Sequence, residues 1–511
     1  MRIGKTLALL LSCALLLTMF PSVKGYAVDR QSEPVSAVSD VALYAAGWQK
    51  KPTKTVSSAK NFPITLNNGD VLQINGTINY TASTGVSPIT VAANATVSII
   101  INGSVTLHGA NASGKTGATA AIKVPSSSKL YIYSAHDEEL STSTAAPKDT
   151  LTVTGGNAAA GTNGTDAERR YTKVNSNAIR YDWYTGSGGA GGGGAAAAIG
   201  GNGGTGGAGA SGWKSTNKDG KEIYVTGTAG LFSLTFHNHD DNPGKAGAAG
   251  SAGTAGTGTG TIYIPGRLTL VAKGGSAAAG GKGGSGCEGM YTLSGNDEMI
   301  GGNGGGGGGG GGCAAPAIGA GGAGGSGGGS GGQLSSDHKG KISGCGGGGG
   351  GGGWPNGGGG GGGGTTASEC GSGANHDGGA GGNGGAAGSA GSAGSSGRTA
   401  NSAVGSTASG GSGGGGVQSG AASGGSGGVR VQNTSAYPGG KGGNGGGAVP
   451  YTAWHTKGSL TLSTANKLNL NSSMGLAYHY GDGQGYGSST YIMPNIVYDL
   501  MDCTVSVNGT Y

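Results

Sequence analysis

The first regular pattern along the chain lies between Phe62 and Thr154, where short runs of β-branched residues alternate with Asn-Gly and Ser-rich turns. Runs of this kind, bounded by turn residues, are typical of β-strands. The predicted strands are Ile64–Leu66, Val71–Ile74, Ile78–Tyr80, Ile89–Val91, Val97–Ile101, Val105–Leu107, Ile122–Val124, Leu130–Tyr133 and Leu151–Val153. Their spacing and the recurring Ile and Val positions favour a right-handed parallel β-helix over residues 62–156, with a β-sandwich as the alternative.

From residue 157 to residue 447 the hydrophobic pattern gives way to glycine at every third position. The longest unbroken run of this period is Gly379, Gly382, Gly385, Gly388, Gly391, Gly394 and Gly397. Three residues per turn is the period of the left-handed extended helix, and collagen is excluded because proline is nearly absent from the triplets. The region therefore predicts a bundle of polyglycine-II helices within one chain. We expect a mainly β protein with little or no α-helix outside the leader.

An internal duplication runs through this region with an offset of 119 residues. The segments TLTVTGGNAAAG and TLVAKGGSAAAG begin at Thr150 and Thr269, and AAAAIG aligns with AAPAIG in the same register. Each copy reads as a strand, a glycine and alanine turn, a polar and aromatic insertion, and an Ala-Ile anchor. We expect strands to continue into the bundle, with Ile199 and Ile318 as equivalent apolar plugs.

The N-terminus has the three parts of a secretory signal peptide. Arg2 and Lys5 precede an apolar run from Leu7 to Phe20, and small residues follow, so residues 1–27 are predicted to be removed. Residues 28–61 are interpreted as a linker. The prediction is an extracellular or cell-surface protein with no membrane span in the mature chain. At the other end, residues 448–511 are predicted as a further β region whose last strand begins another module, so we expect an incomplete chain.

Composition narrows the function classes. Glycine supplies 126 of 511 residues, and charged residues make up 11%. The formal net charge of +6 falls to +3 once the leader with Arg2, Lys5 and Lys24 is removed. This charge is small and scattered, so nucleic acid is not predicted as a partner.

Four cysteines bracket the longest glycine runs. Cys287 and Cys313 lie 26 residues apart, and Cys345 and Cys370 lie 25 apart. Secretion favours disulfides, and closing such loops would contribute about 3 kcal/mol each. We predict these two pairs as disulfides, although four cysteines allow three connectivities. A zinc site is the alternative, but no C-x-x-C spacing supports it.

The insertions between glycine runs contain most of the aromatic residues. The candidate ligand-binding residues are Tyr181, Trp183, Tyr184, Trp213 and Trp354. Loops on a rigid scaffold are the usual place for recognition, and exposed aromatic rings stack on sugars or partner side chains. We expect Tyr181, Trp183 and Tyr184 to lie exposed at one end of the bundle. The alternative is that these rings are apolar plugs that cap the bundle.

Candidate chemistry is sparse. His237, His239, Asp240 and Asp241 form a group that could bind a metal, but the pattern is more typical of a solvated turn, and neither a metal nor a cofactor is predicted. The P-loop pattern at 109–116 lacks room for the helix that must follow it. The predicted strands carry almost no carboxylates for a β-helix lyase or hydrolase, so we do not expect an enzyme.

The passage from β-helical segments into glycine tracts resembles glycine-rich extracellular proteins of Gram-positive-type bacteria, over roughly residues 62–447. The triplets also resemble the polyglycine-II bundles of phage tail-tip adhesins, the snow-flea antifreeze protein and the glycine-rich region of anaplastic lymphoma kinase-type receptors. The resemblance implies a scaffold that presents loops to a surface glycan or a cell-surface protein. The alternatives are a purely structural matrix or envelope protein, a β-helix carbohydrate-active enzyme and an ice-binding protein.

Overall fold

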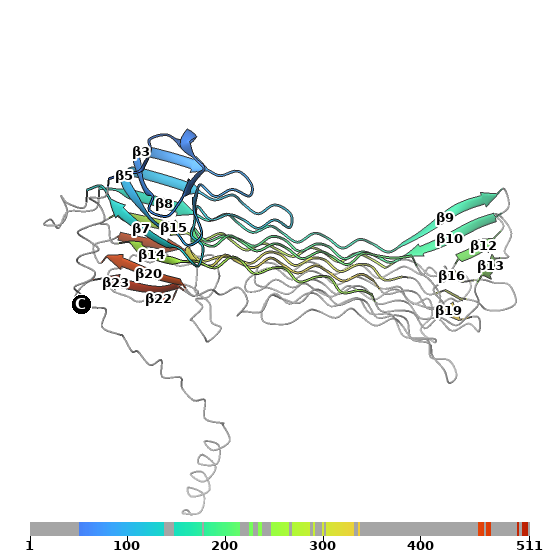
Figure 1. Cartoon of the computed structure of the whole chain (residues 1–511). Coiled ribbons are helices and arrows are strands. Elements are labelled where there is room, and N and C mark those ends of the chain that lie inside the picture. The colour runs from blue at the N-terminus through green and yellow to red at the C-terminus, as the bar shows by residue number, and fades with distance from the viewer. Residues whose placement is uncertain are drawn as a thin grey trace, which may run out of the picture. The chain divides into compact units, whose positions relative to one another are not determined.

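A computed structural model of the 511-residue chain shows a mainly β protein (Figure 1). The structure describes residues 51–136, 148–175, 178–214, 224–227, 234–237, 247–264, 268–286, 290–291, 299–300, 303–331, 336–337, 458–463, 467–471, 498–499 and 503–508. Within these ranges the helical content is one 3-10 turn, η1 (Ala59–Asn61). No helix in the described part is long and apolar enough to cross a membrane. The predicted signal peptide lies outside the described residues.

Two sheets of mostly parallel strands form what we call the base. Its larger sheet contains β1 (Lys54–Val56), β3 (Val71–Thr81), β5 (Thr96–His108), β7 (Lys129–Ser134), β8 (Thr150–Thr154), β14 (Thr261–Ile264), β15 (Thr269–Lys273), β20 (Gly458–Ser463), β21 (Lys467–Asn471), β22 (Tyr498–Asp499) and β23 (Cys503–Asn508). The smaller sheet contains β2 (Ile64–Leu66), β4 (Ile89–Val91), β6 (Ile122–Lys123), β11 (Ile199–Gly200) and β18 (Ile318–Gly319). In both sheets each layer of chain stacks on an earlier one in register.

One apolar core fills the base, and both sheets contribute to it. In the smaller sheet Ile89, Ile122, Ile199 and Ile318 are successive register partners, and all four are 0% exposed. Burying an aliphatic side chain of this size contributes about 1.5–3 kcal/mol. The two predicted plugs, Ile199 and Ile318, are therefore members of this shared core.

Two pairs of predicted strands prove to be single strands. The structure joins 71–74 with 78–80 in β3, and 97–101 with 105–107 in β5. The Asn-Gly pairs between them are kinks and not turns, because Gly76 and Gly103 take positive φ values of 80° and 127° within continuous strands. The side chains of Asn75 and Asn102 stack across the two strands, with Asn102 Nδ2 donating to Asn75 Oδ1 at 2.9 Å.

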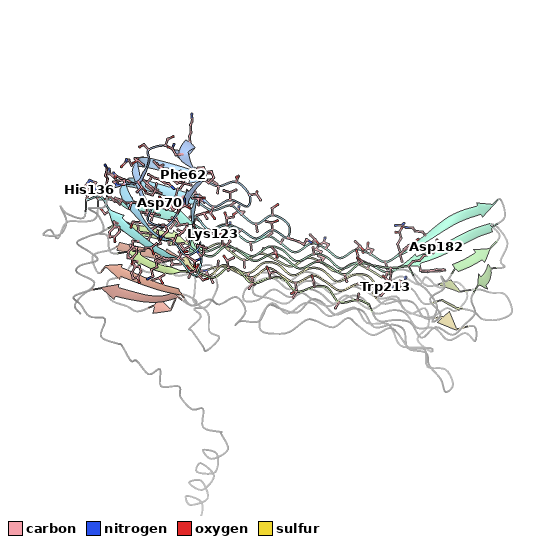
Figure 2. All side chains as sticks on the ribbon, viewed as in Figure 1. Phe62, Asp70, Lys123, His136, Asp182 and Trp213 are labelled. Atoms are coloured by element: carbon pink, nitrogen blue, oxygen red, sulfur yellow. The ribbon has the colours of Figure 1, made fainter. Side chains whose placement is uncertain are left out.

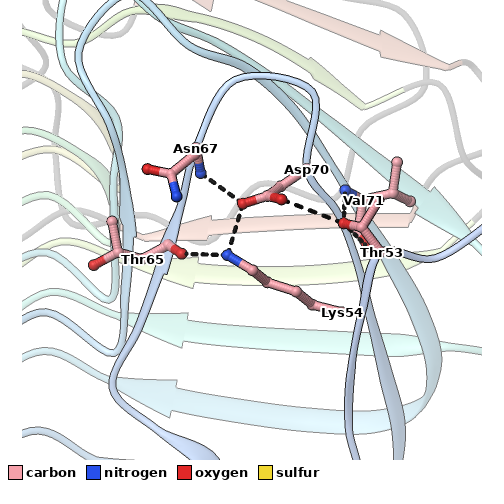
Figure 3. A network of polar contacts seen from close by, with 6 residues as sticks. All are labelled: Thr53, Lys54, Thr65, Asn67, Asp70 and Val71. Atoms are coloured by element: carbon pink, nitrogen blue, oxygen red, sulfur yellow. Dashed lines mark hydrogen bonds and ion pairs between the residues drawn. The ribbon is translucent and has the colours of Figure 1, made fainter.

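The predicted linker over 28–61 ends too late, because the base begins inside it. Strand β1 pairs in parallel with β3, and Lys54 ties this first layer to the loop before β3. Lys54 Nζ donates to Asp70 Oδ2 at 2.7 Å and to the Thr65 carbonyl at 2.9 Å, and Asn67 N donates to the same Asp70 oxygen at 2.7 Å (Figure 3). The sequence of β1 is short and polar, so it gives little sign of a strand. Contacts with its neighbours hold this strand in place.

The 119-residue offset of the duplication reappears in the strand register. Leu151 of β8 pairs with Leu270 of β15, and Ile199 of β11 pairs with Ile318 of β18, each at an offset of 119 residues. One copy of the duplication therefore corresponds to one layer of the base together with the extended chain that leaves and rejoins it.

Between these base strands run extended segments that we call the array: residues 155–167, 185–198, 201–214, 247–260, 274–286, 303–317 and 320–331. In Figure 1 the first two connect β8 with β9 (Glu168–Asn175) and β10 (Ala178–Tyr184) with β11. Backbone hydrogen bonds join each array segment to its neighbours.

The array hydrogen bonds repeat every three residues, as the second segment shows. Gly188, Gly191 and Gly194 donate to the antiparallel segment 201–214, at the carbonyls of Ala210, Gly207 and Gly204. Gly186, Gly189 and Gly192 donate to the parallel segment 303–317, at the carbonyls of Gly304, Gly307 and Gly310. The remaining positions, Ser187, Ala190 and Gly193, donate to Thr165 Oγ1, Thr162 Oγ1 and the Gly114 carbonyl. One segment is thus bonded in three directions.

Close backbone approach explains why the array needs glycine. A Cβ atom added at Gly191 would overlap the carbonyl oxygen of Gly325, and one at Gly309 would overlap that of Ala190. Ala190 carries a Cβ and is half-buried, and its N–H donates to the Thr162 hydroxyl and not to a neighbouring carbonyl.

Side chains join the two copies of the duplication along the array. The side-chain oxygens of Asn157, Asn163 and Asp166 accept the backbone N–H groups that lie 119 residues later, at Ser276, Lys282 and Ser285. These Asx residues supply acceptors where no neighbouring carbonyl does, so they fix the register of one layer against the next.

Two small antiparallel sheets interrupt the array where the sequence predicted loops. The first, which we call the end sheet, has the strand order β13 (Leu234–His237), β12 (Tyr224–Gly227), β10 and β9. The second contains β16 (Met290–Tyr291), β17 (Met299–Ile300) and β19 (Ser336–Asp337). The insertions are therefore structured elements, and four of the predicted ligand-binding residues lie in or beside the end sheet.

Candidate functional site

The end sheet is positioned by the array segments that enter and leave it. Residues 155–167 lead directly into β9, and residues 185–198 leave β10. Where 201–214 reaches the sheet, Lys214 forms a bridge with Tyr184. Thr185 N donates to the Trp213 carbonyl, and Trp213 N donates to Thr185 Oγ1, each at 2.9 Å. Figure 2 labels Trp213 and Asp182 at this end of the array. The hairpin is thus fixed to two array segments.

Strand register divides the end sheet into two faces. Tyr171, Tyr181, Val225 and Phe236 are successive register partners, and they share a face with Ile179 and Trp183. Thr172, Arg180, Thr226 and Thr235 are the partners on the opposite face, together with Glu168, Arg170, Asp182 and Tyr184. The first face, which we call the aromatic face, also carries Arg169 and Lys173 as the register partners of Trp183 and Ile179. We call the second the polar face.

Trp183 corrects the sequence-based expectation of an exposed aromatic patch. Its side chain is 0% exposed. The pleat puts Trp183 on the aromatic face, where burial of its large ring stabilises the sheet. Tyr184, one residue later, falls on the polar face and is half-buried. Trp183 is therefore a packing residue, as the alternative interpretation of these rings held.

The remaining sequence-predicted residues are only partly placed. Tyr181 lies in β10 on the same face as Trp183, and Trp213 is half-buried at the end of its array segment. The Trp213 Nε1 atom is buried and has no hydrogen-bond partner among the described residues. Trp354 lies outside the described residues.

Charged pairs order the polar face. Arg170 lies with its guanidinium 2.7 Å from a Glu168 carboxylate oxygen and 4.9 Å above the centre of the Tyr184 ring. The hydrogen bond between Arg170 and Glu168 lowers the pKa of the Glu168 carboxyl and raises the pKa of the Arg170 guanidinium. Nearer the array, Lys214 Nζ lies 3.2 Å from Asp182 Oδ1. The Arg170–Glu168 pair therefore stays charged at neutral pH.

A second polar cluster lies in the base, where β5 changes partner from β7 to β8. The buried Asp149 carboxylate accepts from Gly103 N at 2.7 Å and from the Ser134 hydroxyl, and its Oδ2 lies 3.0 Å from His136 Nδ1. Sequence analysis missed this cluster because its members come from separate strands. The carboxylate lies between serine and histidine, whereas nucleophilic catalysis requires the imidazole beside the hydroxyl. These contacts connect β5, β7 and the residue before β8 at the point where β5 changes partner.

The metal and disulfide candidates are mostly beyond the described residues. His237 is the last residue of β13, while His239, Asp240 and Asp241 are not described. Within the described ranges no group of three His, Cys, Asp or Glu residues could hold a metal ion. Cys313 is fully buried in the array; Cys287, Cys345 and Cys370 lie outside the described residues, so both disulfides stay predictions.

Comparison with protein-family models, with curated proteins and with solved structures gives no match to this chain.

Proposed function

We propose that the chain is a non-catalytic secreted or cell-surface scaffold whose base and array present the end sheet for adhesion to a surface partner. In this proposal the base is a right-handed parallel β-helix and the array is a polyglycine-II bundle. Secretion rests on the signal peptide predicted for residues 1–27.

Support for the β-helix comes from the order of the layers. Residues 96–108 stack on 71–81, and the strands at 129–134 and 150–154 stack on 96–108, all in parallel and in register. Stacked repeats of this kind share one continuous core, as the base strands do.

Support for the polyglycine-II bundle comes from the three-residue period of the array hydrogen bonds. A helix with three residues per turn directs its N–H groups to three neighbours in turn, and only glycine permits the close contact seen at Gly191 and Gly309.

The observation that carries the adhesion proposal is the direct passage from base strands, through hydrogen-bonded array segments, into the end sheet. At about 3.1 Å per residue, a segment such as 155–167 spans about 40 Å. Because every step is bonded to neighbours, the end sheet is held away from the base on a stiff support. Recognition elements are commonly displayed in this way on rigid scaffolds.

A purely structural matrix role is the second candidate, and the burial of Trp183 favours it because one predicted ligand-binding ring is used for packing. The two functions differ in what the purified protein does. A matrix protein polymerises without a ligand, whereas an adhesin stays dispersed and binds a partner surface.

The test uses the mature chain and a variant in which residues 169–183 are replaced by a two-residue Asn-Gly turn. A matched control replaces Lys115 by Ala in the 113–116 turn, the closed end of a loop that is bonded through its backbone to Gly193 and Gly206 of the array and is not part of the end sheet. We expect the mature chain and the control to bind cells or a glycan array, and the truncated variant to lose binding while sedimenting as the same species. Equal binding by the truncated variant, or spontaneous polymerisation of the mature chain with no binding, would contradict the adhesion proposal.

A further inference from the structure

We propose that two all-glycine runs of this chain, Gly346–Gly353 and Gly357–Gly364, bind side by side to one face of the array, formed by segments 303–317 and 320–331. The inference rests on the polyglycine-II bundle proposed above and names the segments that complete it. Buried N–H groups, the order of neighbours around the two array segments and the glycine content of each triplet support it.

Segment 303–317 is hydrogen-bonded to described neighbours in two of its three directions. In each triplet one N–H group donates to segment 155–167, and the next donates to segment 320–331. The third N–H group of the triplet has no acceptor within the described ranges. These third-row groups are those of Gly305, Gly308 and Gly311. All three residues are buried, and buried backbone N–H groups are almost always paired, so a further acceptor segment must lie on this side.

Segment 320–331 has the same arrangement. Two of its rows of N–H groups donate to segments 247–260 and 185–198. The third row includes Ala323 and Gly329, whose N–H groups have no acceptor among the residues that the structure describes. Both residues are buried, so this segment also requires an acceptor on one side.

The neighbours of segment 303–317 show where its missing acceptor lies. Around this segment the order is 320–331, 185–198, 155–167 and 274–286, because each of these is hydrogen-bonded to the next. The N–H groups of a helix with three residues per turn point in three evenly spaced directions. Two of these directions lead to the first and the third neighbour in the order. The third direction therefore leads past 274–286, to a side where no described segment lies.

The same geometry applies to segment 320–331. Its described neighbours follow the order 303–317, 185–198, 201–214 and 247–260. It donates to the second and the fourth of them, so its third row points to the side that it shares with 303–317, opposite 185–198. The two third rows thus point to two adjacent positions, and the face has room for two segments.

Glycine content distinguishes edge segments from interior ones in the described array. Segment 247–260 has glycine once in most triplets, and most of the Ser and Thr residues between are exposed. Residues 304–312 are glycine at every position and are all buried. Added Cβ atoms at Gly308 and Gly309 would overlap carbonyl oxygens of two different segments. Segment 320–331 is also buried, and it keeps glycine at two positions of each triplet with only Ala, Ser or Gly at the other.

The chain between segment 320–331 and β20 contains two runs with the composition of interior segments, Gly346–Gly353 and Gly357–Gly364. At about 3.1 Å per residue each run spans about 25 Å, close to the roughly 28 Å of residues 304–312. In contrast, Gly385–Gly397 has glycine once per triplet, which is the composition of an edge segment. The two glycine runs are therefore the occupants of the two adjacent positions.

The test measures amide hydrogen exchange of the mature chain by NMR. In the wild type we expect the third-row N–H groups of segment 303–317 to exchange as slowly as those that donate to segment 155–167. The variant is Gly349→Val with Gly360→Val, in which branched side chains prevent the close backbone approach. The matched control is Ala387→Val with Ala390→Val, outside the two runs.

In the valine variant of the two runs we expect the third-row groups to exchange at least about 100-fold faster, while the groups that donate to segment 155–167 stay protected. The control should behave as the wild type. Fast exchange of the third-row groups in the wild type, or unchanged protection in the folded variant, would overturn the inference. Protection that is lost on dilution, together with a dimer in sedimentation, would also overturn it, because the occupant would then belong to a second copy.

These outcomes separate the inference from the proposal on which it rests. If only the third-row groups exchange quickly in the wild type, the proposed bundle and its adhesive function stand, and the assignment of the two glycine runs is wrong. Fast exchange of every row of segment 303–317 would contradict the bundle itself.

Discussion

At the scale of single residues, glycine acts here mainly through what it lacks. Array segments approach so closely that a methyl group at most of the glycines would meet a neighbouring carbonyl oxygen. The sequence period indicates this, because every third residue is held at glycine while its neighbours vary among Ala, Ser, Thr and Asn. The clash partners, such as Gly325 opposite Gly191, depend on which segments pair, and sequence alone does not give that pairing.

Replacing Gly191 by Ala tests this close contact. The added methyl has no space against the Gly325 carbonyl, so we expect the free energy of unfolding to fall by about 1–3 kcal/mol or more. The matched control is Ala190→Ser, the preceding residue, which already carries a Cβ at the array surface. Denaturant unfolding of both variants measures the difference, and equal stability of the two would contradict the close packing.

Asp70 gives the first layer of the base a dependence on pH. Burial alone would raise the pKa of this carboxyl, but hydrogen bonds from Lys54 and Asn67 and the Lys54 charge lower it below its usual value. A lowered folded-state pKa means that the carboxylate stabilises the fold above the unfolded-state pKa of about 3.9, and that this stability is lost as the pH falls through the folded-state value.

The measurement compares wild type with Asp70→Asn between pH 7 and pH 3. We expect the wild type to be the more stable protein at pH 7 and the difference in unfolding free energy to shrink below about pH 4. A difference that stays constant over this range would show that the carboxylate charge has no part in the network.

At the scale of elements, the local pattern predicted which segments are strands better than it predicted where each strand begins and ends. The β-branched runs at 64–66, 89–91 and 151–153 are strands as expected, because side-chain shape and core burial agree there. The errors lie where tertiary contacts override local chemistry. Asn75-Gly76 has the sequence of a turn, yet it continues a strand because Asn102-Gly103 lies beside it in register, and both glycines take positive φ.

The faces of the end sheet could not be predicted because the insertions were interpreted as loops. Without the strand register, Tyr181, Trp183 and Tyr184 form one aromatic group. With it, the pleat separates Trp183 from Tyr184. The aromatic content identified the right element, and the alternation within that element decides which residue is buried.

Replacing Trp183 by Ala should therefore destabilise the protein and leave recognition to other residues. Removing a fully buried indole is expected to cost about 3–5 kcal/mol. Calorimetry and partner binding below the new melting temperature measure the two effects, with Arg170→Gln, a 61% exposed side chain on the other face, as the control for stability. Loss of binding at unchanged stability in Trp183→Ala would restore the original ligand-binding interpretation.

The two disulfides that would cross-link the array are predicted from the cysteine spacing alone. We expect non-reducing peptide mapping of the secreted protein to find Cys287–Cys313 and Cys345–Cys370, and reduction to lower stability by about 3 kcal/mol for each loop closed. Free thiols at all four positions would show that backbone hydrogen bonds hold the array without covalent help.

At the scale of the whole molecule, the duplication is the feature that sequence predicted best. An offset of 119 residues reappears as strand register in both base sheets and as side-chain bonds between array segments at Asn157, Asn163 and Asp166. The offset is kept because the core, the array and the Asx contacts all depend on the same register. A shift in any one of them would disrupt the others.

Amide hydrogen exchange over residues 186–198 tests the central claim, that the array is an ordered bundle, most directly. Every backbone N–H from Gly186 to Ala198 donates a hydrogen bond, and these bonds point to neighbouring segments in a three-residue period. We predict that the whole stretch exchanges slowly, on the timescale of global unfolding, with protection similar to that of β5 in the base. Exchange of this stretch at the rate of an unfolded glycine-rich chain, while β5 remains protected, would contradict the account.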